Sequence, residues 1–279
     1  MSVFLYFPVF VCLFVCSMVT LIFIITALLI LILALTFSTT SSEVMSSNTM
    51  PVANLGDNQL LSCYLNTGSA QTTVKQLTVT WEKNGMTGLV YQYTNGAPDL
   101  GNQNSQFQGR TQLFPNGLVT GNASLLLRNV GSSDNGDYTC TISSSDGGGK
   151  VNIHLRTAAF SAPTFTLSNN TLKAVASRWF PKPNVTWSNS SGAVLQGITE
   201  LTPSSTEMFN VTSRLQPVQV SNTYTCRIYN NVVAAVSDAT VTDSGVSEKT
   251  YFIFSAAPSL LPPANLSIMI SVVCIYFLT

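Results

Sequence analysis

Asp134-Asn-Gly-Asp-Tyr-Thr-Cys140 is the stretch that decides the fold, when it is read together with Cys63 and Trp81. A Cys, then a Trp among strand-like residues, then a second Cys two residues after a Tyr is typical of an immunoglobulin sandwich in an oxidising compartment. We expect a disulfide between Cys63 and Cys140, with Trp81 packed on it and the Tyr138 hydroxyl bonded back across the preceding corner. In the chain-entropy model, closing this loop stabilises the fold by about 4.5 kcal/mol.

Length and charge narrow the class of protein. A chain of 279 residues has room for two domains plus terminal segments. Lys+Arg and Asp+Glu number twelve each, and only 9% of residues are charged. Without a basic field, nucleic acid is not an expected partner. Ser, Thr, Asn and Gln supply the polar faces instead, which suits a surface solubilised by sugar.

Sequons and cysteines both indicate the secretory pathway. The Asn-X-Ser/Thr acceptors are Asn122, Asn169, Asn184, Asn189, Asn210 and Asn265, and we predict glycosylation at the first five. Three of the six cysteines, Cys12, Cys16 and Cys274, lie in apolar terminal segments. Cys63, Cys140 and Cys226 remain, so one of these three lacks an intramolecular partner.

The N-terminus is apolar and uncharged over residues 1–37. Its apolar run, residues 9–35, is longer than a usual signal-peptide core and long enough to span a bilayer as a helix. Residues 1–40 are therefore either a signal peptide, cut near residues 36–42, or an uncleaved membrane anchor. The first basic residue is Lys75, so flanking charge does not decide between the two.

Residues 44–157 have the short alternating runs of an all-β sandwich. Residues 89–93 would form the additional strand that distinguishes a variable-type domain from a constant-type one. Further strands are expected at residues 110–114, 123–127, 138–143 and 151–155. Residues 147–149, all glycine, would form a flexible tip between the last two strands.

The pattern repeats in residues 158–243, which predicts a second, constant-type sandwich. Trp187 and Tyr224 correspond to the core Trp and Tyr of the first domain, and Cys226 corresponds to its second Cys. The expected partner Cys is missing, because Ala174 or Ala176 stands in its place. Cys226 either pairs with another chain or remains a buried free thiol, and we favour the free thiol.

Residues 244–258 read as a polar stalk, and residues 259–279 as a hydrophobic C-terminal tail. The apolar run 266–278 is short for a bilayer span and has no Lys or Arg after it. Small residues 255–257, a spacer and this run match a lipid-anchor attachment signal. A short transmembrane helix and a merely hydrophobic tail are the alternatives. We expect a membrane-anchored protein on the external face of the plasma membrane.

No residue pattern favours catalysis. The single histidine, His154, lies in a predicted strand and should project to solvent rather than act as a base. Residues 146–150 contain a glycine run without the strand and helix of a phosphate site. No Cys or His pair has metal-ligand spacing. We expect no enzyme activity, cofactor, metal or small-molecule substrate.

One charged pair has a structural interpretation. Arg110 and Asp134 fit the ion pair that closes the bottom of variable-type domains. The alternative is that both charges are solvated.

A binding surface is the remaining functional feature. The outer face of one sheet, with the loops at its ends, is where such domains recognise partners. Tyr91, Tyr93, Ser145 and Asp146 are our candidate receptor contacts. Aromatic residues in such a sheet can equally serve cross-strand packing.

Several runs also resemble a known family, the butyrophilin-related costimulatory and coinhibitory ligands of the immunoglobulin superfamily. They are Trp81-Glu-Lys, Gly88-Leu-Val, Phe107-Gln-Gly-Arg-Thr, Gly121-Asn-Ala-Ser-Leu, Asp134-X-Gly-X-Tyr-X-Cys and Arg178-Trp-Phe-Pro. The resemblance covers about residues 54–242. The Cys and Tyr motifs are shared by all immunoglobulin domains, whereas the Gly-Arg-Thr, Gly-Asn-Ala-Ser and Arg-Trp-Phe-Pro runs are more specific.

The resemblance implies a ligand on an antigen-presenting or epithelial cell that engages a receptor on T cells. It further implies lowered T-cell activation, proliferation and cytokine release. The missing Cys near Ala174 departs from the family pattern and puts the second domain's disulfide in doubt. The same motifs would fit the alternative function, an adhesion molecule that binds itself or a related chain.

Overall fold

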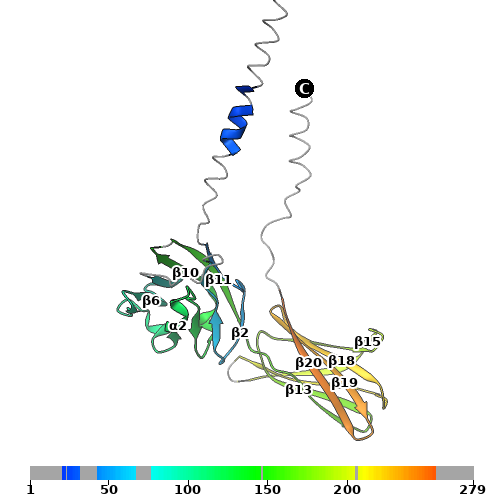
Figure 1. Ribbon diagram of the computed structural model, residues 1–279. Helices are drawn as coiled ribbons and strands as arrows, with labels where there is room; N and C mark the ends of the chain where they lie inside the picture. The colour runs from blue at the N-terminus through cyan, green and yellow to red at the C-terminus, as the bar shows by residue number, and fades with distance from the viewer. Residues whose placement is uncertain are drawn as a thin grey trace, which may run out of the picture.

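The computed structural model describes residues 21–22, 24–31, 43–66, 77–145, 147–204 and 207–255. Two β-sandwiches follow one another along the chain (Figure 1). Residues 21–22 and 24–31 are helical. The described part of the chain contains no helix with the length and hydrophobicity that a bilayer crossing requires.

The larger sheet of the first sandwich has six strands. Their order is β2 (Val52–Asn54), β11 (Gly147–Ala158), β10 (Gly136–Ser144), β5 (Thr78–Lys83), β6 (Tyr91–Thr94) and β7 (Ala97–Pro98). Only the β2–β11 pair is parallel. Strands β6 and β7 extend the sheet beyond β5, as expected for a variable-type domain.

Short strands form the opposite layer of this sandwich. β3 (Gln59–Leu61), β9 (Leu125–Leu127) and β8 (Thr111–Gln112) make one sheet, and β1 (Glu43–Met45) pairs with β4 (Tyr64–Asn66). The short helices are η1 (Ser105–Phe107), α2 (Pro115–Leu118) and η2 (Ser132–Asp134). The strand expected at residues 110–114 is only two residues long, because Pro115 begins α2 just after it. The strand expected at 123–127 begins only at Leu125.

The core of the first sandwich is built around the disulfide between Cys63 and Cys140. Trp81 lies opposite Cys140 in the ladder between β5 and β10, and both residues are fully buried. The indole Nε1 of Trp81 donates to the carbonyl of Ala123 at 3.0 Å, so its only polar atom is satisfied. Period-2 alternation along β5 places Val79 and Trp81 on this inner face.

The second sandwich packs four strands against five. The first sheet is β12 (Thr164–Ser168), β13 (Thr171–Trp179), β17 (Phe209–Leu215) and β16 (Gly197–Pro203). The second is β15 (Val194–Leu195), β14 (Asn184–Asn189), β18 (Thr223–Tyr229), β19 (Val233–Thr242) and β20 (Gly245–Phe254). Its core contains Trp179, Trp187 and Cys226.

The predicted polar stalk, residues 244–258, is wrong for residues 245–254. These residues form β20, which pairs antiparallel with the whole of β19, from Thr242 opposite Gly245 to Val233 opposite Phe254 (Figure 1). A tight turn with Gly245 at φ 148° reverses the chain. The polar residues in the first half of the segment led to the stalk prediction. Its β-branched and aromatic residues nevertheless favour a strand. The second sandwich therefore extends beyond residue 243, to Phe254.

The two sandwiches contact each other through a short junction. The Leu55 N–H donates to the Ala158 carbonyl at 2.9 Å, and the Phe160 N–H donates to Asn54 Oδ1 at 3.1 Å. From the second sandwich, Arg178 Nη2 donates to the Leu55 carbonyl at 2.7 Å. The Asn54 side chain and the Leu55 main chain of the first domain thus bond to residues of the linker and of the second domain.

Candidate functional site

The outer face of the six-stranded sheet points away from the core of the first sandwich. Cross-strand partners share a face, so the residues opposite outward-pointing Thr139 and Thr141 also point outward. We define the outer face by Thr80, Glu82, Gln92, Asp137, Thr139, Thr141, Lys150, Asn152 and His154. Every one of these side chains is polar, so the face is suited to hydrogen bonding.

Cross-strand bonds organise part of this face. Asp137 Oδ1 lies 2.7 Å from His154 Nδ1, and the Thr139 hydroxyl donates to Asn152 Oδ1 at 3.0 Å. The His154 side chain remains 42% exposed, in line with the solvent-facing position expected from its strand. These bonds link the side chains of neighbouring strands across the face.

The two tyrosines predicted as receptor contacts point the other way. Tyr91 lies opposite Trp81, and Tyr93 lies opposite Val79, so both face the core. Tyr91 is only 6% exposed, and its burial raises the pKa of its phenol. Tyr93 is partly buried against the same core. The expected position on the outer face is wrong for both tyrosines, because the register between β5 and β6, which sequence alone does not give, decides which face they occupy.

Of the other two predicted contacts, Ser145 lies in the turn after β10. Ser145 is exposed at this turn, and Asp146 lies outside the described residues. The expected flexible tip at residues 147–149 is instead part of β11, paired with Ile142 and its neighbours in β10. A Cβ on Gly148 would lie 2.4 Å from the Ile142 carbonyl oxygen. Glycine is needed there for close approach of two backbones rather than for flexibility.

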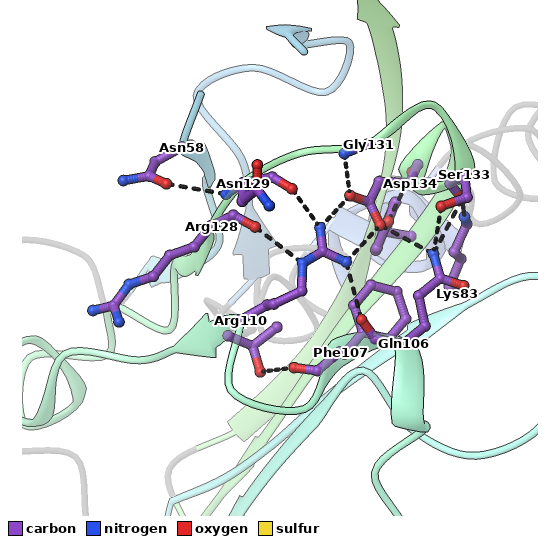
Figure 2. Close-up of polar contacts among 12 residues, drawn as sticks. Asn58, Lys83, Gln106, Phe107, Arg110, Arg128, Asn129, Gly131, Ser133 and Asp134 are labelled. Carbon is purple, nitrogen blue, oxygen red and sulfur yellow. Dashed lines mark hydrogen bonds and ion pairs between the residues drawn. The ribbon is translucent and has the colours of Figure 1, made fainter. Parts of the chain in front are cut away.

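Arg110 and Asp134 form a buried charge cluster at one end of the sandwich (Figure 2). The guanidinium contacts both carboxylate oxygens, with Nη1 at 3.2 Å from Oδ1 and Nη2 in contact with Oδ2. Asp134 is completely buried. Its carboxylate also accepts from the Gly131 N–H at 2.8 Å and from Gln106 Nε2 at 3.1 Å.

These bonds set the protonation state of Asp134. Burial by itself would raise the pKa of this carboxyl group, since a dry environment disfavours charge. The bonds from Arg110, Gly131 and Gln106 outweigh burial and hold the pKa of Asp134 below its usual value. The cluster therefore contains an ionised, fully bonded carboxylate that ties η2 to the segment before β8.

Lys83 is a member of this cluster that the sequence analysis missed. Its Nζ donates to the Ser133 carbonyl at 2.5 Å and lies 5.6 Å from the centroid of the Tyr138 ring. Burial lowers the pKa of Lys83, partly opposed by the charge of Asp134. The signal was present in the sequence: alternation from Val79 through Trp81 points Lys83 inward.

Tyr138 joins the cluster to the disulfide. Its hydroxyl donates to the Asp134 carbonyl at 2.8 Å, which is the expected bond across the corner before β10. Burial raises the pKa of Tyr138, so the phenol stays protonated. Two residues later along β10, Cys140 forms the disulfide with Cys63 that joins this sheet to the opposite layer.

Cys226 is a free, buried cysteine in the second sandwich. Burial raises the pKa of its thiol to about 12. Ala174 and Ala176, where a partner Cys was expected, are both buried in the same core. Trp187 lies opposite Cys226 in the ladder, and its Nε1 donates to Ser213 Oγ at 2.8 Å. Tyr224 is also buried, and its hydroxyl accepts from the Gln219 N–H at 3.0 Å.

None of the five sequons within the described residues lies in the six-stranded sheet. Asn122 lies between α2 and β9, and Asn169 lies in the turn after β12. Asn184 and Asn189 are the first and last residues of β14, and Asn210 lies in β17. Asn265 lies outside the described residues. Sugar at the five positions would leave the outer face uncovered.

Comparisons with known proteins agree with this architecture. Residues 47–156 match the model of the immunoglobulin V-set domain, and residues 167–236 match that of the butyrophilin subfamily 3 member A2-like Ig-C domain. V-set domain-containing T-cell activation inhibitor 1 of Rattus norvegicus is 36% identical over 219 residues, which cover 74% of this chain and 76% of the relative. The Homo sapiens protein of that name is 35% identical, over 71% of this chain and 72% of its own.

The chain belongs to the family of V-set domain-containing T-cell activation inhibitor 1. This confirms the resemblance to the butyrophilin-related ligands and the expected order of a variable-type and a constant-type domain. A solved structure of the human B7-H4 IgV-like domain is 33% identical in sequence. The match covers 42% of this chain and 96% of the solved chain, with a TM-score of 0.37. This family is one of immunoglobulin-superfamily immune ligands, which typically are not enzymes.

Proposed function

We propose that the chain is a cell-surface ligand that binds a protein receptor on T cells and thereby lowers T-cell activation, proliferation and cytokine production. The observation that carries the proposal is its relatedness, across both domains, to proteins named T-cell activation inhibitors. The first sandwich would bind the receptor, and the second sandwich would connect the first to the membrane.

The outer face of the six-stranded sheet is the surface we assign to the receptor. Its side chains are polar, and cross-strand hydrogen bonds join some of them. The five described sequons lie elsewhere and would carry sugar on the remaining surfaces. Ser145, exposed at the turn after β10, stays a candidate contact, and so does Asp146, which lies outside the described residues.

The terminal segments supply the proposed membrane attachment. Residues 1–40 would serve as a signal peptide or an N-terminal anchor, and residues 259–279 as a lipid-anchor signal or a short transmembrane segment. Contact between two membranes engages many copies at once, so weak pairwise affinity is sufficient. Release of the protein from cells by a phospholipase that cuts lipid anchors would distinguish the two C-terminal alternatives.

The proposal is tested with the full chain displayed on cells that are then mixed with activated T cells. We expect the displaying cells to bind T cells that lack this protein, and to reduce their proliferation and cytokine release. Cells that carry no copy of the chain provide the control. Binding only to cells that bear this same protein would instead establish the adhesion alternative and contradict the proposal.

A further inference from the structure

The last four residues of β20 form an exposed apolar segment at the edge of the second sandwich. Tyr251 is 50% exposed, Phe252 37%, Ile253 47% and Phe254 48%. Tyr251 and Ile253 lie opposite Val236 and Ala234 and share their face of the sheet, while Phe252 and Phe254 occupy the opposite face. Apolar side chains therefore project from both faces of this strand end. We call residues 251–254 the aromatic edge.

The aromatic edge lies at the junction between the two sandwiches. The ring of Phe160, in the linker, is 5.1 Å from that of Phe252 and 5.7 Å from that of Phe254. The Ser255 N–H donates to the Val232 carbonyl at 2.9 Å, in the turn between β18 and β19. Without β20 the chain would leave the sandwich after Thr242, at the far end. The ten residues of β20 carry it back about 34 Å to the junction.

The sequence that follows is apolar. Ten residues, 256–265, separate Ser255 from the run 266–278, and this spacer contains no charged side chain. Fully extended, ten residues reach at most about 35 Å. If the tail attaches the protein to a membrane, the aromatic edge is held within that distance of the bilayer surface.

We infer that the aromatic edge rests in the headgroup region of the bilayer to which the C-terminal tail attaches, so that the junction, rather than the far end of the second sandwich, contacts the membrane. The inference rests on the membrane attachment proposed above. Tyr and Phe are suited to the boundary between lipid headgroups and acyl chains. The neighbouring charges, Glu248 and Lys249, are opposite in sign and favour neither anionic nor cationic lipid.

The depth of contact follows from the backbone. An edge strand presents unpaired N–H and C=O groups, which the hydrocarbon core does not tolerate but the hydrated headgroup layer does. The aromatic edge should therefore enter the interface without penetrating the hydrocarbon. The alternative to membrane contact is a dimer, in which the aromatic edges of two copies pair strand to strand. The experiment below distinguishes membrane contact from this dimer.

The test uses the full chain in phosphatidylcholine nanodiscs, with Cys12, Cys16 and Cys274 replaced by Ser. A polarity-sensitive fluorophore is attached to Ile253→Cys or, as the matched control, to Val194→Cys. Val194 is 74% exposed on β15, the opposite edge strand of the same sheet. A small fraction of lipids carries a nitroxide quencher at the headgroup. The Tyr251→Cys chain repeats the measurement at a second position of the aromatic edge.

We expect the nitroxide lipids to quench the label at position 253 at least about twofold more strongly than the label at position 194, with a blue-shifted emission. Equal quenching at the two positions would overturn the inference. Protection of position 253 that depends on the number of copies per nanodisc, without quenching, would overturn it in favour of a dimer. A chain that does not co-purify with nanodiscs would overturn both attachment and inference, while T-cell binding by the immobilised chain would still test the receptor proposal.

Discussion

The two sandwiches retain the same Trp and Tyr positions but are held together differently. The first joins its sheets with the Cys63–Cys140 disulfide, whereas the second has a free Cys226 and alanines where the partner would lie. The second domain instead adds a strand, β20, and buries two tryptophans in its core. The comparison teaches that the sandwich of this fold can do without the disulfide when other side chains fill the core.

The polar bonds of the core differ in the same way. Trp81 donates to a main-chain carbonyl, whereas Trp187 donates to the side chain of Ser213, which is itself fully buried. The Tyr138 hydroxyl donates to a carbonyl, and the Tyr224 hydroxyl accepts from an N–H. Stability of the second domain therefore depends more on individual side-chain bonds, and that of the first on its covalent bridge and charge cluster.

The largest expected difference comes from the two kinds of cysteine. Cys140→Ser should lower the free energy of unfolding of the first domain by about 4.5 kcal/mol, enough to abolish surface expression of a marginally stable domain. Cys226→Ser, which removes no bridge, should be expressed at the surface. Flow cytometry with an antibody to a terminal tag checks both. Equal surface levels of the two variants would contradict the comparison.

The charge cluster gives the next largest effect. Asp134→Ala leaves Arg110 without its carboxylate partner and removes the negative charge near the buried Lys83, and should destabilise the first domain by about 3 kcal/mol. Asp137→Ala, three residues away, removes an exposed carboxylate and should cost less than about 1 kcal/mol. Hydrogen exchange read out by mass spectrometry reports each domain separately. Equal effects of the two substitutions, or a loss of protection in the second domain instead, would contradict this role of the charge cluster.

The same carboxylate predicts an acid sensitivity confined to the first domain. The pKa of Asp134 is lower in the folded state than the unfolded value of about 3.9, so the ionised carboxylate stabilises the fold above that pH. The stabilisation should disappear as the pH falls below about 4, through the folded pKa. Denaturant unfolding at a series of pH values checks this. In an Asp134→Asn chain the first domain should lose less stability over that interval.

A smaller effect is expected from the polar core of the second domain. Ser213→Ala leaves the Trp187 N–H unbonded in the core and also removes the partner of the Thr199 hydroxyl, at a cost of about 2 kcal/mol. Thr212→Ala, on the outer face of the same strand, is the control and should be nearly neutral. Calorimetry should show a lowered transition for the second domain alone. An unchanged transition would mean that water replaces the lost bond.

The sequence predicted the features that depend on residue identity and alternation. Cys63, Trp81 and Cys140 sufficed for the first sandwich and its bridge, and the second Trp and Tyr indicated the second sandwich. What failed depended on pairing between strands. Tyr91 was placed on the wrong face because its register with Trp81 is a tertiary property, and β20 was missed because its strand pattern needs β19 beside it. Lys83 could have been found by extending the alternation that located Trp81.

The most direct test of the account is receptor binding by single variants on the two outer faces of the first domain. Glu82→Lys changes the outer face of the six-stranded sheet, and Leu60→Lys changes the exposed outer face of the opposite sheet. Both full-length chains should reach the surface at the level of the unchanged chain. We predict that Glu82→Lys reduces binding to activated T cells by about tenfold, as loss of a central polar contact would, and that Leu60→Lys has no effect. Full binding by Glu82→Lys together with loss by Leu60→Lys would contradict the assignment of the receptor to this face.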